Sequence, residues 1–353
     1  MSLLFIGIAL FSFAATAVGV PFFRAFVLKK GVIDTPNERS SHTIPTPRGG
    51  GLVMAAAILL GYIAGGVLAG YSISAGYLIG AALVIGISIL DDIYSLPSPL
   101  RFGIHFIAAT TVIYLEKPFA GIEIPLSENV FSFGWAAIPL TVLWIVWLTN
   151  AYNFMDGIDG IAGIQAVAAG LGWAIFLYPK DLSGPAQLAA VTAAAAMGFL
   201  IHNWQPAKIF MGDAGSAFLG FTFAVMPLIF GSLDPKIDAF LPLIAIGMVW
   251  PFFFDSVYTL VRRVLRLEPV WRAHRSHLYQ KMVISGMSHR SVTTLYGAFA
   301  IITALIFGIC YRLKNGITIG IALCAVEAVF LIVFVHFRVS RERERPRVQT
   351  DET

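Results

Sequence analysis

Long apolar runs separated by short polar segments make up most of the chain. A helix needs about 20 apolar residues to cross the hydrocarbon core of a bilayer. Residues 49–90 contain no Asp, Glu, Lys or Arg, which leaves room for two such helices with a turn near residues 65–76. The pattern predicts eleven transmembrane helices, at residues 2–23, 49–90 (two), 102–115, 129–149, 160–179, 182–201, 214–233, 239–260, 291–311 and 316–337.

The composition agrees with this pattern and excludes other classes. Of the 353 residues 58% are hydrophobic and 12% are charged, about half the charge of a soluble domain. A soluble enzyme, a disordered chain and a disulfide-stapled secreted module are therefore excluded. The two cysteines, Cys310 and Cys324, lie in apolar segments and predict no disulfide framework. We predict an all-α polytopic membrane protein.

The basic residues predict its orientation. With the N-terminus outside, 19 of the 24 Lys and Arg residues fall on one side, which the positive-inside rule identifies as the cytoplasm. The first 23 residues have no basic n-region or clear cleavage site, so we expect a retained helix. We expect one transmembrane domain, 1–337, and a charged cytoplasmic tail, 338–353. The other cytoplasmic segments are 21–50, 90–101, 150–160, 202–213 and 261–290.

Polar groups of candidate chemical importance gather in these cytoplasmic loops. The first loop carries Asp34, His42 and then Arg48 before three glycines. Glycines before a helix let backbone N–H groups approach a phosphate, although a simple Pro/Gly turn gives the same pattern. The second loop begins with Asp91 and Asp92. Two adjacent carboxylates at a membrane boundary need a partner, water or a metal, and interfacial anchors are the alternative explanation.

The third and fourth loops carry further carboxylates. Asn153, Asp156 and Asp159 are spaced by three residues, which places them on one face if the segment is helical. The terminal Glu of an EF-hand is absent, so a calcium loop of that type is rejected. Asn203 opens the fourth loop, and Asp213 ends it between glycines. That position suits a Mg²⁺ ligand beside a phosphate, with helix capping as the simpler alternative.

The fifth loop is basic and contains His274, Arg275 and His277. A zinc site would need more nitrogen or sulfur ligands, so phosphate binding by Arg and His is preferred. An ordinary positive-inside loop with incidental histidines is the alternative. His105 and Glu327 are lone polar groups within spans, and we assign them structural roles.

Taken in order, residues 34–280 resemble the polyprenyl-phosphate N-acetylhexosamine-1-phosphate transferase superfamily, of the glycosyltransferase family 4 type. The resemblance implies that polyprenyl phosphate attacks the β-phosphate of a UDP-N-acetylamino sugar, giving polyprenyl-diphospho-sugar and UMP. It implies Mg²⁺ as the cofactor, with Mn²⁺ as the alternative. The last loop lacks the consecutive histidines of the phospho-MurNAc-pentapeptide translocase, and Arg48 stands where that enzyme has Met. Both features are closer to the bacterial O-antigen and surface-glycan initiators.

Residue roles follow from motif position in that family. The resemblance implies that the catalytic residues are Asp91, Asp92 and Asp213, and that the metal ligands are Asp213, Asp156 and Asp92. It implies that the substrate-binding residues are His42, Arg48, Asn153, Asp156, Asp159, Asn203, His274, Arg275 and His277. One of Asp91 and Asp92 resembles a base that deprotonates the lipid phosphate. A covalent aspartyl intermediate stays open as the alternative mechanism.

The expected partners are a UDP-N-acetylhexosamine, undecaprenyl phosphate and the lipid bilayer, with no nucleic acid; a homodimer is a candidate assembly. The resemblance implies the bacterial cytoplasmic (inner) membrane, with the site facing the cytoplasm. UDP-GlcNAc and 6-deoxy sugars such as UDP-FucNAc or UDP-QuiNAc are candidate substrates, and the 6-deoxy group is slightly favoured. A lipid-linked-sugar transporter or flippase is the rival hypothesis. It is disfavoured because most acids lie at span ends and no internal repeat is visible.

Overall fold

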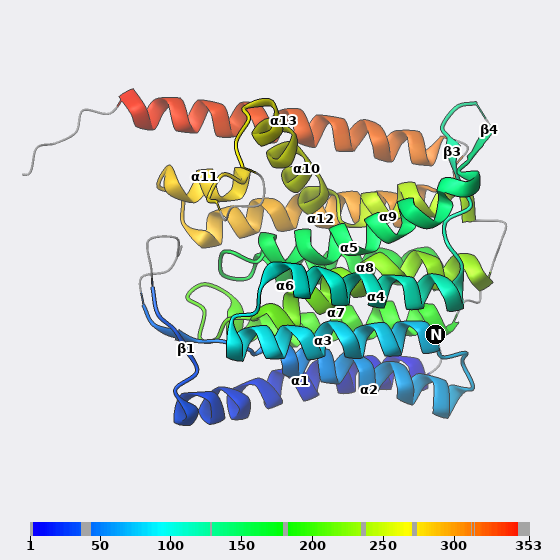
Figure 1. Cartoon of the computed structure of the whole chain (residues 1–353), viewed down its shortest axis with the longest axis horizontal. Helices are drawn as coiled ribbons and strands as arrows, with labels where there is room; N and C mark the ends of the chain where they lie inside the picture. The colour runs from blue at the N-terminus through cyan, green and yellow to red at the C-terminus, as the bar shows by residue number, and fades with distance from the viewer. Residues whose placement is uncertain are drawn as a thin grey trace, which may run out of the picture.

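The computed structural model describes residues 3–36, 44–127, 129–178, 183–233, 238–269, 274–311, 313 and 315–344. Within these residues the chain is a bundle of long helices that run between two ends of the molecule (Figure 1). The helices are α1 Leu3–Lys30, α2 Gly51–Ala69, α3 Ala75–Tyr94, α4 Ser98–Glu116, α5 Ala137–Met155, α6 Ile161–Leu177, α7 Ser183–Asn203, α8 Asp213–Leu233, α9 Leu241–Met248, α10 Trp250–Leu265, α11 Leu278–Ile284, α12 His289–Cys310 and α13 Gly316–Glu344.

The all-α polytopic prediction is confirmed. Among the described residues, eight helices are long and apolar enough to cross a membrane, or nine if α9 and α10 form one span. The two remaining predicted spans coincide with α6 and α4. Helix α6 has only 17 residues, and α4 is not among the eight helices that are long and apolar enough. Each predicted span therefore overlaps at least one helix. The number of membrane spans, eleven, and their orientation stay predictions.

Three element boundaries differ from the prediction. The span expected at 129–149 is displaced to α5, because Asn129–Ser132 (β4) pairs antiparallel with Gly121–Ile124 (β3) instead of starting a helix. This hairpin lies at the end of the bundle remote from α11 (Figure 1). The span expected at 239–260 is two helices, α9 and α10, which meet at 89°. Finally, α13 continues to Glu344, into the expected tail.

The bend between α9 and α10 has a local cause. Pro251 is the second residue of α10 and has no backbone N–H, and its ring clashes with the carbonyl four residues earlier. Val249 between the helices leaves helical geometry, with φ −119° and ψ 23°. As a result α10 leaves the direction of the bundle and carries its basic C-terminal turn toward α11.

Glycine allows two segments of the site to approach each other. A Cβ atom on Gly51 of α2 would lie 2.5 Å from the Cα of Gly215 in α8, closer than real Cβ contacts. The backbone of the preceding loops is paired as well: Gly51 N–H donates to Met211 O (2.9 Å) and Phe210 N–H to Pro47 O (2.9 Å). The short strands β1 (Ile33–Asp34) and β2 (Thr46–Pro47) lie in the same region. The first and fourth loops are thereby joined.

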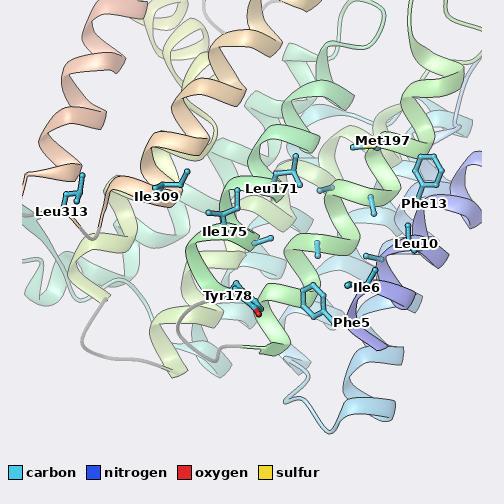
Figure 2. A pocket seen from close by; sticks show the side chains of 16 residues that line it. Phe5, Ile6, Leu10, Phe13, Leu171, Ile175, Tyr178, Met197, Ile309 and Leu313 are labelled. Atoms are coloured by element: carbon cyan, nitrogen blue, oxygen red, sulfur yellow. The ribbon is translucent and has the colours of Figure 1, made fainter. Parts of the chain in front are cut away.

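An apolar cavity of about 730 Å³ lies among α1, α6, α7 and α12. Figure 2 shows Phe5, Leu171 and Ile309 among its lining side chains. Among the described residues, its lining contains no charged side chain, and Tyr178 supplies its only hydroxyl group. This cavity therefore offers no groups for phosphate chemistry.

Candidate active site

A polar cavity of about 230 Å³ brings the predicted loops together. It lies where the C-terminus of α5, the N-terminus of α8 and the loop before α2 meet, at the end of the bundle that carries β1 and α11 (Figure 1). Its lining residues are Asp34, Arg48, Asn153, Asp156, Gly157, Ile158, Asp159, Asn203, Phe210, Met211, Gly212, Asp213, Gln280 and His289.

Carboxylate and amide oxygens from two helix ends face this cavity. Helix α5 ends at Met155, so Asn153 is helical while Asp156 and Asp159 lie in the following turn. The expectation of a single helical face therefore fails, because the chain turns at Gly157 and Gly160, and Gly160 has φ +76°. Asn153 Oδ1 accepts a hydrogen bond from the Ser216 hydroxyl of α8. That bond joins the third loop to the helix that begins at Asp213.

The pKa of Asp156 is altered by burial and by the carboxylates beside it. Burial, followed by the nearby Asp213 and Asp159 carboxylates, raises the pKa of Asp156 to about 7. Like charges at short range disfavour ionisation, and a cation would reverse the effect. Among the described residues, no hydrogen bond reaches the Asp156 carboxylate. This side chain is therefore available to a cation.

Asp159 is bound by protein groups instead. Its Oδ2 accepts from Ala207 N–H (3.1 Å), and His289 Nδ1 lies 3.3 Å from its Oδ1. The Thr293 hydroxyl donates to the Asp159 backbone carbonyl (2.7 Å). Asp159 thus joins the third loop to the fourth loop and to α12.

Two arginines accompany the acidic pair. Arg48 Nη2 lies 3.2 Å from Asp92 Oδ1, and the same nitrogen donates to the Asp92 carbonyl (2.9 Å). Arg101 forms an ion pair with Asp91, and its Nη1 lies 3.5 Å from Asp213 Oδ2. Asp91 also accepts from Leu96 N–H. These ion pairs place two guanidinium groups beside the acidic cavity, and Arg101 links the second loop to the fourth.

Asn203 is buried and serves the backbone. Its Oδ1 accepts from Gly160 N–H (3.0 Å) and its Nδ2 donates to Ile209 O (3.0 Å). Both ends of the amide are therefore used to join the third and fourth loops. Although it lines the cavity, this residue acts mainly as a positioning group.

The fifth loop is held beside the site by Asp255, a residue of α10 that is fully buried. The Asp255 carboxylate accepts from Leu278 N–H (2.8 Å), Tyr279 N–H (3.1 Å) and the Tyr296 hydroxyl (2.7 Å), and His277 Nδ1 lies 3.2 Å away. His277 is itself buried. Within segment 261–290, Gln280 and His289 line the cavity.

His274 lies beside His277, with ring centroids 5.1 Å apart, and neither lines the cavity. Partial burial, together with His277 and Arg263, lowers the pKa of His274 to about 4. The imidazole is therefore neutral at physiological pH and can act as a hydrogen-bond partner but not as a cation.

The sequence was compared with known proteins. The model of glycosyl transferase family 4 matches residues 74–231. The probable undecaprenyl-phosphate N-acetylglucosaminyl 1-phosphate transferase of Bacillus subtilis (strain 168) is 31% identical over 319 residues, which covers 89% of this chain and 86% of the relative. The chain belongs to glycosyl transferase family 4. This confirms the family predicted from the loops.

Other relatives refine the placement of this family 4 transferase. The decaprenyl-phosphate N-acetylglucosaminephosphotransferase of Mycobacterium leprae (strain TN) is 30% identical, covering 74% of this chain and 72% of the relative. The phospho-N-acetylmuramoyl-pentapeptide-transferase of Listeria innocua serovar 6a is 24% identical, covering 62% of this chain and 72% of the relative. The chain is more similar to these polyprenyl-phosphate N-acetylglucosamine-1-phosphate enzymes than to the translocase, which confirms the predicted distance from the translocase.

The predicted site residues of this family 4 transferase divide into three groups. Those that line the cavity are Arg48, Asn153, Asp156, Asp159, Asn203 and Asp213. Those that do not are Asp91, Asp92, His274, Arg275 and His277. His42 lies outside the described residues. Gln280 and His289 line the cavity without having been predicted, and Arg101 was overlooked as a partner of two acids.

The oxygen ligands at the cavity of this family 4 transferase fit the way in which proteins commonly bind Mg²⁺. Among the described residues, no group of three His, Cys, Asp or Glu side chains could bind a metal alone. Mg²⁺ commonly takes one or two carboxylates and completes its shell with water and substrate phosphates. Asp156 and Asp213 both line the cavity and interact electrostatically, and they would supply two such oxygen ligands. Asp92 binds Arg48 instead, so it is the weakest of the three predicted ligands.

Proposed function

We propose that this protein transfers N-acetylglucosamine 1-phosphate from UDP-N-acetylglucosamine to undecaprenyl phosphate, with Mg²⁺, at the cytoplasmic face of a bacterial inner membrane. A phosphate oxygen of the lipid forms a bond to the β-phosphorus of the nucleotide sugar, and the bond to UMP breaks. The products are undecaprenyl-diphospho-N-acetylglucosamine and UMP, which begin a surface glycan. The observation that carries the proposal is the acidic cavity flanked by Arg48 and Arg101 at one end of an apolar bundle.

The residues have distinct proposed roles. Asp156 and Asp213 would bind Mg²⁺, which neutralises the diphosphate when present. Arg48 and Arg101, oriented by Asp92 and Asp91, would bind phosphate oxygens and stabilise the charge that shifts to UMP. A phosphate monoester has a second pKa near 6, so the lipid phosphate is largely a dianion at neutral pH. The base role of Asp91 or Asp92 is therefore a small contribution in this proposal.

The sugar is proposed from the relatives in Bacillus subtilis and Mycobacterium leprae, whose names specify N-acetylglucosamine. UDP-FucNAc and UDP-QuiNAc are the alternative substrates that the test compares with UDP-N-acetylglucosamine. A role in O-antigen synthesis stays a prediction. Gln280 and Asp34 at the cavity are the side chains we expect to contact the nucleotide sugar.

The test is UMP release by the purified protein. With undecaprenyl phosphate and Mg²⁺, UDP-N-acetylglucosamine should give UMP faster than the two 6-deoxy sugars, and EDTA should abolish release. Mn²⁺ should restore part of it. If no UDP-N-acetylhexosamine gives UMP under conditions where a known transferase works, the enzyme proposal fails and the transporter hypothesis gains.

A further inference from the structure

A second polar cavity, of about 780 Å³, lies between α10, α11 and α13. It is separate from the candidate active site, although α11 borders both. Gln280 of α11 lines the acidic cavity, whereas Leu278 and Lys281 line this one. Adjacent residues on a helix point about 100° apart, so neighbouring side chains of α11 face different cavities. No step of the proposed transfer uses this second cavity.

One rim of the cavity is basic. Arg262 comes from the last turn of α10, Arg266 directly follows that helix, and Lys281 comes from α11. Two acids also line it. Glu268 is paired with Arg263 (Nη1–Oε2 3.0 Å), and Glu342 lies exposed on α13. Positive charge therefore predominates on the α10 and α11 side.

Two guanidinium groups at this cavity have an unused donor. Arg262 donates from Nη2 to Ser276 O (2.9 Å), and Arg338 donates from Nη2 to Ser285 O (3.3 Å) at the cavity wall. The Nε atom of each is buried and has no hydrogen-bond partner among the described residues. A ligand in the cavity cannot reach these Nε atoms, but the guanidinium group of Arg262, which lines the cavity, has further N–H donors. This side of the cavity therefore suits a ligand with anionic oxygens.

Apolar side chains also line the cavity. On α13 they are Ile332, Val335 and Val339, with His336 and Ser340 among them, and Leu278 and Ile284 of α11 add further apolar surface. These α13 residues straddle the predicted end of the last span at residue 337, where lipid headgroups meet acyl chains. A soluble anion would use the basic rim alone, whereas an amphiphile would use the apolar surface as well.

We propose that this cavity binds one anionic glycerophospholipid, its phosphate at Arg262, Arg266 and Lys281 and an acyl chain along α13. Charge complementarity and the location at a predicted membrane boundary favour this occupant. The sequence agrees, because residues 261–290 and 338–353 together contain 12 of the 24 Lys and Arg residues. The proposal is independent of the transfer reaction and of which sugar is used.

The experiment measures lipid binding to the full-length protein by native mass spectrometry, with phosphatidylglycerol and phosphatidylcholine as probes. The wild type should bind one phosphatidylglycerol roughly tenfold or more in preference to phosphatidylcholine. The double variant Arg266→Gln, Lys281→Gln should lose that preference. The matched control Lys29→Gln, Lys30→Gln removes two exposed charges at the end of α1 and should keep it. The thermal unfolding midpoint shows that each variant is folded.

Three results would overturn the proposal. The first is equal binding of the two lipids by the wild type, or full retention of phosphatidylglycerol by the double variant. The second is displacement by glycerol phosphate at concentrations similar to the lipid, which would assign the cavity to a soluble anion. The third is one-for-one displacement by undecaprenyl phosphate, which would assign it to the substrate lipid.

Discussion

The carboxylates around the active-site cavity differ in their partners, and that difference separates their roles. Asp159 accepts a backbone N–H and lies beside His289, so its charge is already balanced by protein groups. Asp156 is buried and faces other acids, and burial followed by these acids raises its pKa. Asp213 shares Arg101 with Asp91. Asp156 and Asp213 are therefore the pair most in need of an added cation.

Asp213→Asn tests this assignment. We expect UMP release to fall roughly 100-fold or more, because the amide removes a charge that would bind Mg²⁺ beside the reacting phosphate. The thermal unfolding midpoint should change little. Glu116→Gln removes a charge at the far end of α4 and should retain turnover. Near-normal activity of Asp213→Asn would remove this residue from the metal site.

His274 predicts a pH dependence of stability. Its pKa is lowered to about 4 in the folded protein, below its ordinary value of 6.5, so the unfolded chain binds more protons between these limits. Folding stability is therefore lost as the pH falls from 6.5 toward 4. His274→Gln should reduce this loss, as measured by unfolding midpoints at pH 7 and pH 5. His336→Gln, exposed on α13, is the comparison, and identical slopes in all three proteins would contradict the prediction.

The sequence located the acids of the site but not all of their neighbours. Aspartates and asparagines at span ends are conspicuous in a chain with so little charge. His289 was not predicted because it is separated from Asp159 by 130 residues in the sequence, and no local pattern indicates that the two are in contact. The sequence pattern assigned no role to Arg101, and the packing of α4 against α3 brings it to Asp91.

At the scale of elements, hydropathy finds helices but not their interruptions. Residues 129–132 carry no charge and so lengthen the charge-free run of a predicted span, yet they pair with β3 as a hairpin. The uncharged stretch around Pro251 similarly suggests one span, whereas the proline divides it into α9 and α10. The first difference moves polar groups relative to the site, since Asn150 and Asn153 become helical.

The contact between α2 and α8 gives a prediction at this scale. Gly51→Ala should force the helices apart and shift Asp213, because the new Cβ would meet Gly215 backbone at 2.5 Å. We expect a lower unfolding midpoint and loss of most UMP release. Gly86→Ala in α3 is the matched control, since its Cβ would meet nothing within 4 Å. It should be neutral or slightly stabilising. Equal behaviour of the two variants would contradict a requirement for close approach.

At the scale of the whole molecule, all five predicted loops come to one end, and this arrangement supports a single orientation. Reporter fusions after Arg101 and after Arg290 should both report a cytoplasmic location. The reason is the concentration of basic residues on that side. A fusion after Lys117, near the β3–β4 hairpin, should report the opposite side. A periplasmic result at Arg101 or Arg290 would contradict the eleven-span topology.

The network around Asp255 also has a consequence for biogenesis. The Asp255 carboxylate enters the membrane with α10, but its partners His277 and Tyr296 are synthesised 22 and 41 residues later. An unpaired carboxylate is costly in hydrocarbon. The bent α9–α10 segment therefore gains its full set of partners only after Tyr296 of α12 has been synthesised. The parts of the active site that carry Gln280 and His289 are then the last to be completed.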